Sequence, residues 1–273
     1  MTSAPLDVAV VGDNTIDRFV DEPDLGDLVG GNALNVAVQL SMLGLRVGYF
    51  GAVGTDPDAE IVRTAAAARG VDVSGLVALP GSTALTTIRR DAGGDRHFES
   101  EDFGVTAQYH PDADAFRRIA TARWVHVGML PSARAFGEEL AALSSAPLSQ
   151  DCSVSPERHR LAVSFASAGE DESEAERIIA AALASSTLAV ATLGSRGARA
   201  GRADGTRWQV PSRPIQVIDT TGAGDSFMAG FIAARLGRDD VEHALIGGVE
   251  RGAFTCQYHG GWPQLRADVD LFG

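Results

Sequence analysis

Short apolar runs alternate with helix-like segments along most of this 273-residue chain, and this alternation narrows the possible folds more than any other feature. The first apolar run, Leu6 to Gly12, ends at the polar pair Asp13-Asn14, as buried parallel strands often do at a functional edge. The alternation predicts a mostly parallel sheet with helices on both faces and a ligand site at the carboxyl ends of the strands. Further strands are expected at 46–53, 124–128, 161–165, 188–193 and 215–218. Helices are expected at 33–43, where Asn32 would be the cap, at 56–69 and at 172–184; two more would begin at 111 and 132, and one would run through 235.

Two strand-like runs, 83–90 and 96–101, do not fit this alternation. The turn-rich segment 91–95 joins them, and this pattern predicts a hairpin. We therefore expect a small β-sheet lid, formed from segments near 14–29 and 82–104.

The rest of the chain is expected to belong to the same single domain, spanning residues 1–273. Residues 144–160 interrupt the alternation with Pro147 and Pro156, so a shortened or irregular element is expected there. Because a small lid would leave sheet edges exposed, we also expect that a homodimer forms through it.

The composition excludes several kinds of site. The sequence contains no lysine, so every basic residue is arginine. A Walker A loop, a protein-kinase strand lysine and a Schiff-base amine all need lysine and are therefore excluded. The formal net charge of −13 repels phosphate backbones and argues against a nucleic-acid partner.

The location of the chain is predicted from what its sequence lacks. No run of about eighteen apolar residues is present to span a bilayer, and a strand-like run begins at Leu6 where a secretory signal would need a longer apolar segment. We expect a cytoplasmic protein without a membrane partner. Its two cysteines, Cys152 and Cys256, are expected to be reduced thiols.

The sharpest candidate for a catalytic site is the string DTTGAGDSF at residues 219–227, which opens a helix. Small residues at such a turn allow backbone N–H groups to approach a ligand, and the helix dipole favours an anion there without any cationic side chain. A carboxylate in the same turn, Asp225, would lie beside the anion and accept a proton from a bound hydroxyl. The alternative for an isolated turn of this kind is that the glycines only permit a tight bend and Asp225 only stabilises the helix N-terminus.

The whole string resembles the second signature of the ribokinase-like (PfkB) carbohydrate kinases. The resemblance runs from about residue 6 to residue 263 and is weakest between 105 and 160. It implies a ribokinase-like α/β fold, with a doubly wound, mostly parallel sheet and a small β lid, and ATP-dependent phosphoryl transfer to a hydroxyl of a small molecule. Three more segments match the family in the expected order: VGDNTID at 11–17, GGNALN at 30–35 and TLGSRG at 192–197.

The resemblance also implies roles for individual residues. Asp225 would be the base, and its GAGD segment would hold the transferred phosphoryl group. Asp17 and Asn35 would hold sugar hydroxyls, with Asp13 as a further hydroxyl acceptor. The residues implied are, for the anion hole, Gly222, Ala223 and Gly224; for the substrate, Asp13, Asp17, Gly30, Gly31 and Asn35; and for the nucleotide, Thr192, Gly194 and Gly197.

The sequence departs from the family where metal ions are concerned. Family members often carry an Asn-x-x-Glu segment whose Glu helps to organise the waters of Mg²⁺, but here the corresponding stretch, 165–172, contains no Asn. Glu170 or Asp171 is the candidate for that role, and the alternative is that this acidic run is the solvated first turn of a helix. The resemblance also implies a monovalent cation, possibly K⁺, at Asp219 and Thr221.

The acceptor is suggested by the C-terminal motif QYHGGW at residues 257–262, which resembles the fructoselysine 6-kinase branch of the family. The segments 12–17, 30–38 and 165–168 resemble the same branch. This favours phosphorylation of fructoselysine at its 6-hydroxyl, or of a related fructosamine. Two alternatives remain: another sugar or nucleoside kinase, such as a fructokinase or a ribokinase, and a non-catalytic sugar or nucleotide sensor on the same fold.

Overall fold

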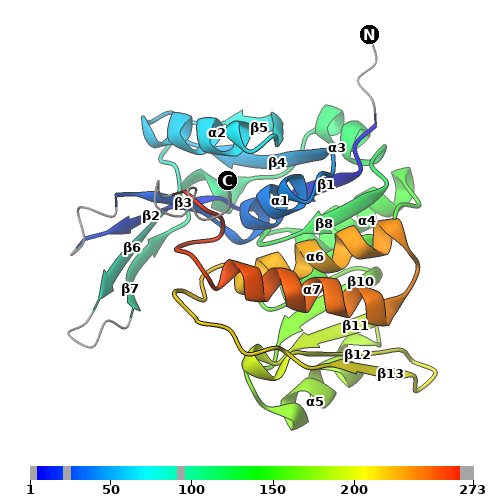
Figure 1. Ribbon diagram of the computed structural model, residues 1–273. Coiled ribbons are helices and arrows are strands. Elements are labelled where there is room, and N and C mark those ends of the chain that lie inside the picture. Colours follow the sequence, from blue (N-terminus) through cyan, green and yellow to red (C-terminus); the bar gives the residue numbers. More distant parts are fainter. Residues whose placement is uncertain (1–4, 21–25, 91–95, 265–273) are drawn as a thin grey trace.

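A nine-stranded sheet forms the centre of the computed structural model, which describes residues 5–20, 26–90 and 96–264 (Figure 1). Its strand order is β13-β12-β11-β10-β9-β8-β1-β4-β5. The pairs from β5 to β11 are parallel, and β12 and β13 extend one edge in antiparallel fashion. The strands are β1 (Val8–Val11), β4 (Val47–Val53), β5 (Asp72–Ala78), β8 (Trp124–Val127), β9 (Leu148–Asp151), β10 (Leu161–Ser167), β11 (Ser186–Thr192), β12 (Ala198–Gly201) and β13 (Arg207–Val210).

Helices cover both faces of this sheet, as the alternation in the sequence predicted. The side chains of β1 show the reason, because Val8 and Val10 pack into one apolar core while Ala9 and Val11 pack into another. The first core includes helices α1, α2, α6 and α7, and the second includes α3 and α4. The helices are α1 (Asn32–Met42), α2 (Asp58–Ala68), α3 (Ala113–Ile119), α4 (Ala133–Leu143), α5 (Glu172–Ala182), α6 (Ala223–Gly237) and α7 (Val241–Thr255), with 3₁₀ turns η1 (Gly104–Gln108) and η2 (Gly194–Arg196).

A second, small sheet projects from the carboxyl edge of the large one (Figure 1). Its strand order is β3-β2-β6-β7, formed by β3 (Leu28–Gly30), β2 (Thr15–Phe19), β6 (Leu85–Arg90) and β7 (Arg96–Asp102). The β6–β7 pair is antiparallel, as the hairpin pattern predicted, while β2 and β6 are parallel. The expected turn at 91–95 lies outside the described residues. The closing of this sheet as a lid and its pairing with a second copy remain predictions.

The structure differs from the expectation at residues 215–218 and agrees with it at residues 144–160. The apolar run 215–218 was expected to be a strand, and this is wrong: it is a connection outside the sheet without regular secondary structure, with Val217 54% and Ile218 48% exposed. The antiparallel β12–β13 pair extends that edge of the sheet instead. The irregular element expected within 144–160 is confirmed, because the segment contains only the four-residue strand β9 followed by a loop.

No helix within the described ranges is long and apolar enough to cross a membrane.

Candidate active site

Asp13 lies at the carboxyl end of β1 and holds the start of helix α1. Its two carboxylate oxygens accept hydrogen bonds from the backbone N–H groups of Asn32 (2.8 Å) and Ala33 (2.9 Å). The expectation that Asn32 caps this helix with its own side chain is therefore wrong, since Gly31 is the N-cap residue and the side chain of Asp13 fills the capping role. Burial raises the pKa of Asp13 to about 6.

The Asn32 side chain is thus free of the cap and joins two carboxylates. Its amide group donates to Oδ1 of Asp225 (2.7 Å) and to Oδ2 of Asp151 (2.8 Å). A second amide, that of Asn35 one turn further along α1, donates to Oδ2 of Asp225 (2.6 Å). Both oxygens of Asp225 are therefore held by neutral donors from α1, although Asp225 itself lies in the first turn of α6.

Burial dominates the electrostatics of Asp225 and raises its pKa to about 8. The negative charges of Asp151 and Asp13 raise this pKa further, while the hydrogen bonds from Asn35 and Asn32 lower it. Burial also raises the pKa of Asp151. A carboxyl group whose pKa lies near neutral pH is well suited to exchange a proton with a bound hydroxyl.

Sequence reasoning missed Asp151 and the role of Asn32. Asp151 ends β9, in the segment where the sequence pattern was irregular. Its signal was a carboxylate at the end of a short strand, the same signal that Asp13 gives after β1. Asn32 belongs to the GGNALN segment that was singled out, but an Asn before a helix is ambiguous between a cap and a ligand.

The turn before α6 has a shape that only glycine permits at position 222. Gly222 has a φ of +72°, and a Cβ there would lie 2.6 Å from Cα of Gly261. Around Gly224, by contrast, an added Cβ would meet nothing within 4 Å, so the first turn of α6 borders open space. Backbone N–H groups in the first turn of a helix lack intrahelical acceptors. This turn therefore offers donors to an anion.

Asp219 fixes the same turn to the C-terminal segment. Its Oδ1 accepts from the N–H (3.0 Å) and the hydroxyl (2.8 Å) of Thr221, and its Oδ2 accepts from the N–H of Gly260 (2.8 Å). The two residues considered for a monovalent cation are thus hydrogen-bonded to each other. The cation itself remains a prediction.

The QYHGGW motif lies under this turn in a buried polar network. The Gln39 amide donates to the hydroxyl of Tyr258 (2.9 Å) and to the carbonyl of Gly261 (2.6 Å). Thr255 connects the network to α6 by donating to the hydroxyl of Ser226 (2.6 Å). The motif was expected to mark a substrate branch, and here it packs the C-terminal segment against α1 and α6.

A cleft of about 200 Å³ opens between this centre and the small sheet. It brings together most of the residues predicted to bind substrate, while Gly30 lies just outside the lining and packs against the Asp17 carboxylate. Among the described lining residues, five are carboxylates and none is Arg or His. The predicted residues in the lining are Asp13, Asp17, Gly31, Asn35, Thr221, Gly222 and Asp225, and the lining also includes Asn14, Thr15, Asn32, Thr86, Glu101, Asp102, Phe103 and Met129.

The three residues predicted to border a nucleotide lie at the end of β11 and in the turn that follows it. Thr192 ends the strand, Gly194 begins η2, and the carbonyl of Gly197 accepts a hydrogen bond from the N–H of Leu193 (2.7 Å). Gly197 has a φ of +93° and packs directly against the backbone of Val210, so a side chain has no room there.

The two acidic candidates for a magnesium role lie beside this turn and serve different purposes. Glu170 accepts a hydrogen bond from the hydroxyl of Ser195 (2.5 Å), which lowers the pKa of Glu170. Asp171 caps helix α5 by accepting from the N–H groups of Ser173 (2.8 Å) and Glu174 (3.1 Å). Across the described residues, no group of three or more His, Cys, Asp or Glu is arranged to hold a metal ion.

Comparison with known proteins agrees with this fold. Residues 7–146 and 153–266 match the pfkB family carbohydrate kinases, and the chain belongs to that family. It is therefore a sugar kinase of an ATP-dependent family. It is 32% identical to the fructoselysine 6-kinase of Escherichia coli, over 93% of this chain and 99% of that protein, and 31% identical to the fructosamine kinase FrlD of Bacillus subtilis, over 92% and 90%. A solved E. coli protein described as a putative ribokinase II, in complex with ATP and Mg²⁺, has the same fold, with a TM-score of 0.75, 22% identity and 94% coverage of each chain.

Proposed function

We propose that this kinase transfers the γ-phosphoryl group of ATP to a hydroxyl of a fructosamine, with the 6-hydroxyl of fructoselysine as the first candidate. The observation that carries the proposal is the acidic character of the cleft, where five carboxyl groups line the described walls and none of the described lining residues is Arg or His. A fructosamine carries an amine that is protonated at neutral pH, whereas fructose, ribose and adenosine are neutral. An ammonium group is attracted to such a cleft, and a phosphorylated acceptor is repelled.

A cationic acceptor would also change the protonation state of the proposed base, Asp225. With a pKa of about 8, Asp225 is mostly protonated at neutral pH when the cleft is empty. A positive charge placed nearby stabilises the carboxylate and lowers this pKa. Binding of an ammonium-bearing sugar would therefore convert Asp225 to the form that accepts a proton.

In the proposed reaction, Asp225 accepts the proton of the sugar hydroxyl while Asn32 and Asn35 hold its two oxygens in place. The hydroxyl oxygen forms a bond to the γ-phosphorus, and the bond between that phosphorus and the β–γ bridging oxygen breaks as ADP leaves. Backbone N–H groups of the 222–225 turn would stabilise the phosphoryl oxygens. Asp17 and Asp13 would orient the sugar.

The residues present fit ATP and Mg²⁺ without a lysine. The turn before α6 borders open space at Gly224 and offers N–H donors, and Thr192, Gly194 and Gly197 would border the nucleotide. ATP supplies the phosphoryl group, and Mg²⁺ offsets its charge. In proteins Mg²⁺ is usually held by one or two carboxylates together with phosphate oxygens and water, so the single carboxylate of Glu170, acting through water, is compatible with it.

Three subsidiary proposals accompany this function. A monovalent cation such as K⁺ would bind near Asp219 and Thr221, where its effect is measurable as a change in kcat when K⁺ replaces Na⁺. The small sheet would close over the acceptor as a lid. An exposed edge of this sheet would pair in a homodimer, which a monomeric mass in solution at micromolar concentration would rule out.

The test of the main proposal is ADP release with Mg-ATP, measured against fructoselysine, N-fructosyl-methylamine, fructose, ribose and adenosine. We expect both fructosamines to be turned over with the highest kcat/KM, and the Asp225→Asn variant to lose this turnover. Efficient turnover of fructose or ribose in preference to the fructosamines would replace the proposal with a fructokinase or ribokinase activity. ATP binding without turnover of any acceptor would instead support a sensor.

A further inference from the structure

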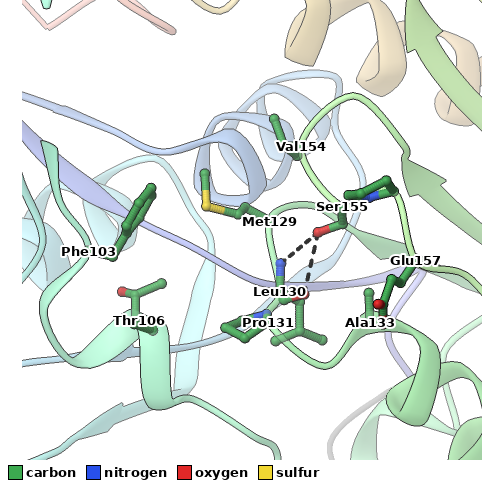
Figure 2. A pocket seen from close by; sticks show the side chains of 11 residues that line it. Phe103, Thr106, Met129, Leu130, Pro131, Ala133, Val154, Ser155 and Glu157 are labelled. Carbon is green, nitrogen blue, oxygen red and sulfur yellow. Dashed lines mark hydrogen bonds between the residues drawn. The ribbon is translucent and has the colours of Figure 1, made fainter.

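A second cavity, with a volume of about 270 Å³, adjoins the acceptor cleft. Phe103 and Met129 line both spaces, so the two cavities are neighbours. Figure 2 shows Phe103 on one side of the second cavity and the loop that carries Ser155 on the other. The loop belongs to the irregular segment 144–160, whose part in the fold the sequence did not explain.

The walls of this cavity are mainly apolar, with little other than carbon exposed on Phe103, Met129, Leu130, Pro131, Val154 and Pro156. Covering apolar surface of this kind with methylene groups removes it from water and lowers the free energy of the complex. A sugar, with a hydroxyl on almost every carbon, does not match it. The cavity is therefore suited to a part of the acceptor that is not the sugar ring.

The loop that forms the far wall is held in a fixed shape. The hydroxyl of Ser155 is buried, accepts from the N–H of Leu130 (3.0 Å) and donates to the carbonyl of Gly128 (3.1 Å). The Gln150 amide donates to the carbonyls of Ser155 (2.5 Å) and Glu157 (2.9 Å). Such a preformed wall loses little entropy when a ligand binds.

The charged residue in the lining is Glu157, which lies across the cavity from Phe103 (Figure 2). Within the part of the chain that the structure describes, no hydrogen bond or ion pair engages its carboxylate. From the acceptor cleft outward, the surface thus runs from carboxylates, through an apolar stretch, to a single carboxylate at the rim.

We propose that this cavity, which we call the arm groove, binds the substituent on the nitrogen of the acceptor. An aliphatic arm would lie against Met129 and Val154, and a primary ammonium at its end would pair with Glu157. This inference rests on the proposed fructosamine kinase function and adds the chemistry of the arm. The preferred acceptors are fructosamines of diamines or of side-chain amino groups rather than fructosamines of short amines.

Three acceptors test the length of the arm and the charge at its end separately. They are the mono-N-fructosyl derivatives of methylamine, pentylamine and 1,5-diaminopentane. We expect wild-type kcat/KM to be about tenfold higher for the pentyl than for the methyl arm, because methylene groups become buried. The terminal ammonium should add about a further two- to fivefold, as expected for a partly exposed ion pair.

Two variants and one control assign these preferences to the groove. Glu157→Gln should remove the preference for the terminal ammonium and keep the preference for the longer arm. Val154→Ser should lower the preference for the longer arm by about twofold or more, because it replaces apolar contact with a hydroxyl. Glu250→Gln makes the same chemical change as Glu157→Gln at an exposed position of helix α7 and should alter neither ratio.

Equal kcat/KM for all three acceptors would overturn the arm groove and leave the fructosamine kinase proposal intact. A preference for the terminal ammonium that survives Glu157→Gln would overturn the role of Glu157. No turnover of even the methylamine derivative, with turnover of fructose or ribose, would overturn the proposed function and the arm groove together.

Discussion

The side-chain amide of Asn35 donates a 2.6 Å hydrogen bond to Oδ2 of Asp225, a residue 190 positions later in the sequence. The Asn35 side chain packs between two glycines, since a Cβ on Gly261 would overlap its amide and a Cβ on Gly222 would lie 3.5 Å from its nitrogen. The proposed base is therefore oriented by the first helix of the chain, and that helix is positioned by the last segment.

Replacement of Asp225 by Asn should abolish turnover much more than it affects ATP binding. The change removes the group that accepts the hydroxyl proton but keeps the size of the side chain, so we expect kcat to fall by about 10²- to 10⁴-fold. ADP release measures kcat, and titration calorimetry measures the Kd for ATP. Asp114→Asn, at an exposed position of helix α3, is the control and should change neither quantity. A kcat within about threefold of the wild type would exclude Asp225 as the base.

The same carboxyl group should make the stability of the ligand-free protein depend on pH. In the folded protein the pKa of Asp225 is about 8, compared with an ordinary value of 3.8, so the folded state binds this proton more tightly than the unfolded state does. The proton therefore stabilises the fold at low pH, and that contribution is lost as the pH rises from about 4 to about 8. The free-energy change is of the order of a few kcal/mol.

Thermal unfolding of the wild type and Asp225→Asn, measured between pH 5 and pH 8, tests this directly. Asn cannot ionise, and we expect the difference in Tm to move in favour of the variant as the pH rises. A constant offset between the two curves is also expected, because an Asn amide would face a donor of either Asn32 or Asn35. Parallel curves across the whole range would show that Asp225 is not buried as a high-pKa acid.

The main features of the fold could be predicted from local patterns in the sequence. The apolar run that became β1 packs on both of its sides, so it appears as a continuous apolar segment. The run 215–218 has the same local appearance but is exposed, because the antiparallel pair β12–β13 occupies that edge of the sheet. Which apolar run finds a place in a sheet depends on strand pairing between distant segments, and a local pattern does not contain that information.

The candidate site could be predicted only in part, because some of its residues are brought together by the fold and not by a local pattern. Asp225 stands in a string whose glycines have a local conformational purpose, so the string itself points to a ligand. Asp151 stands in a segment with no such pattern, and only the folded chain brings it within 2.8 Å of the Asn32 amide. Asn32 was interpreted as a helix cap because Asp13, which fills that position, is distant in sequence.

Substitution of Gly261 by Ala should reduce activity, although Gly261 is not among the residues proposed to bind substrate. The new Cβ would overlap Oδ1 of Asn35 and displace the amide that holds Asp225. We expect kcat to fall by about tenfold or more, because a small misplacement of a catalytic group is costly. The hydrogen bond from Asn35 lowers the pKa of Asp225, so its loss should also move the acidic limb of the pH–rate profile to higher pH.

The pH profile separates this positioning effect from a general loss of stability. Gly237→Ala is the matched control, because an added Cβ at that helix end would meet nothing within 4 Å and should leave both kcat and the profile unchanged. A Gly261→Ala variant with lower kcat but an unshifted acidic limb would show that Asn35 does not act through the protonation of Asp225.

The last prediction concerns Gln264, which joins the C-terminal segment to the small sheet. Its amide nitrogen donates to the carbonyl of Val29 (2.7 Å) and its oxygen accepts from the N–H of Val29 (2.8 Å). Because β3 is an edge strand, these two bonds satisfy backbone groups that would otherwise face solvent or another chain. Gln264 thus holds β3 beside Gly31 and the cleft.

Gln264→Ala should therefore speed hydrogen exchange at the backbone N–H of Val29 and raise the KM for the acceptor more than it lowers kcat. Two hydrogen bonds of about 0.5–1.5 kcal/mol each are lost, so we expect exchange to accelerate by about tenfold or more if opening of β3 controls it. Mass spectrometry of the peptide that contains residues 28–31 gives the exchange rate, and Gln209→Ala, on exposed strand β13, is the control. Unchanged exchange at Val29 would mean that β3 is held by its pairing with β2 alone, and any change in KM would then have to arise from another contact of the C-terminal segment.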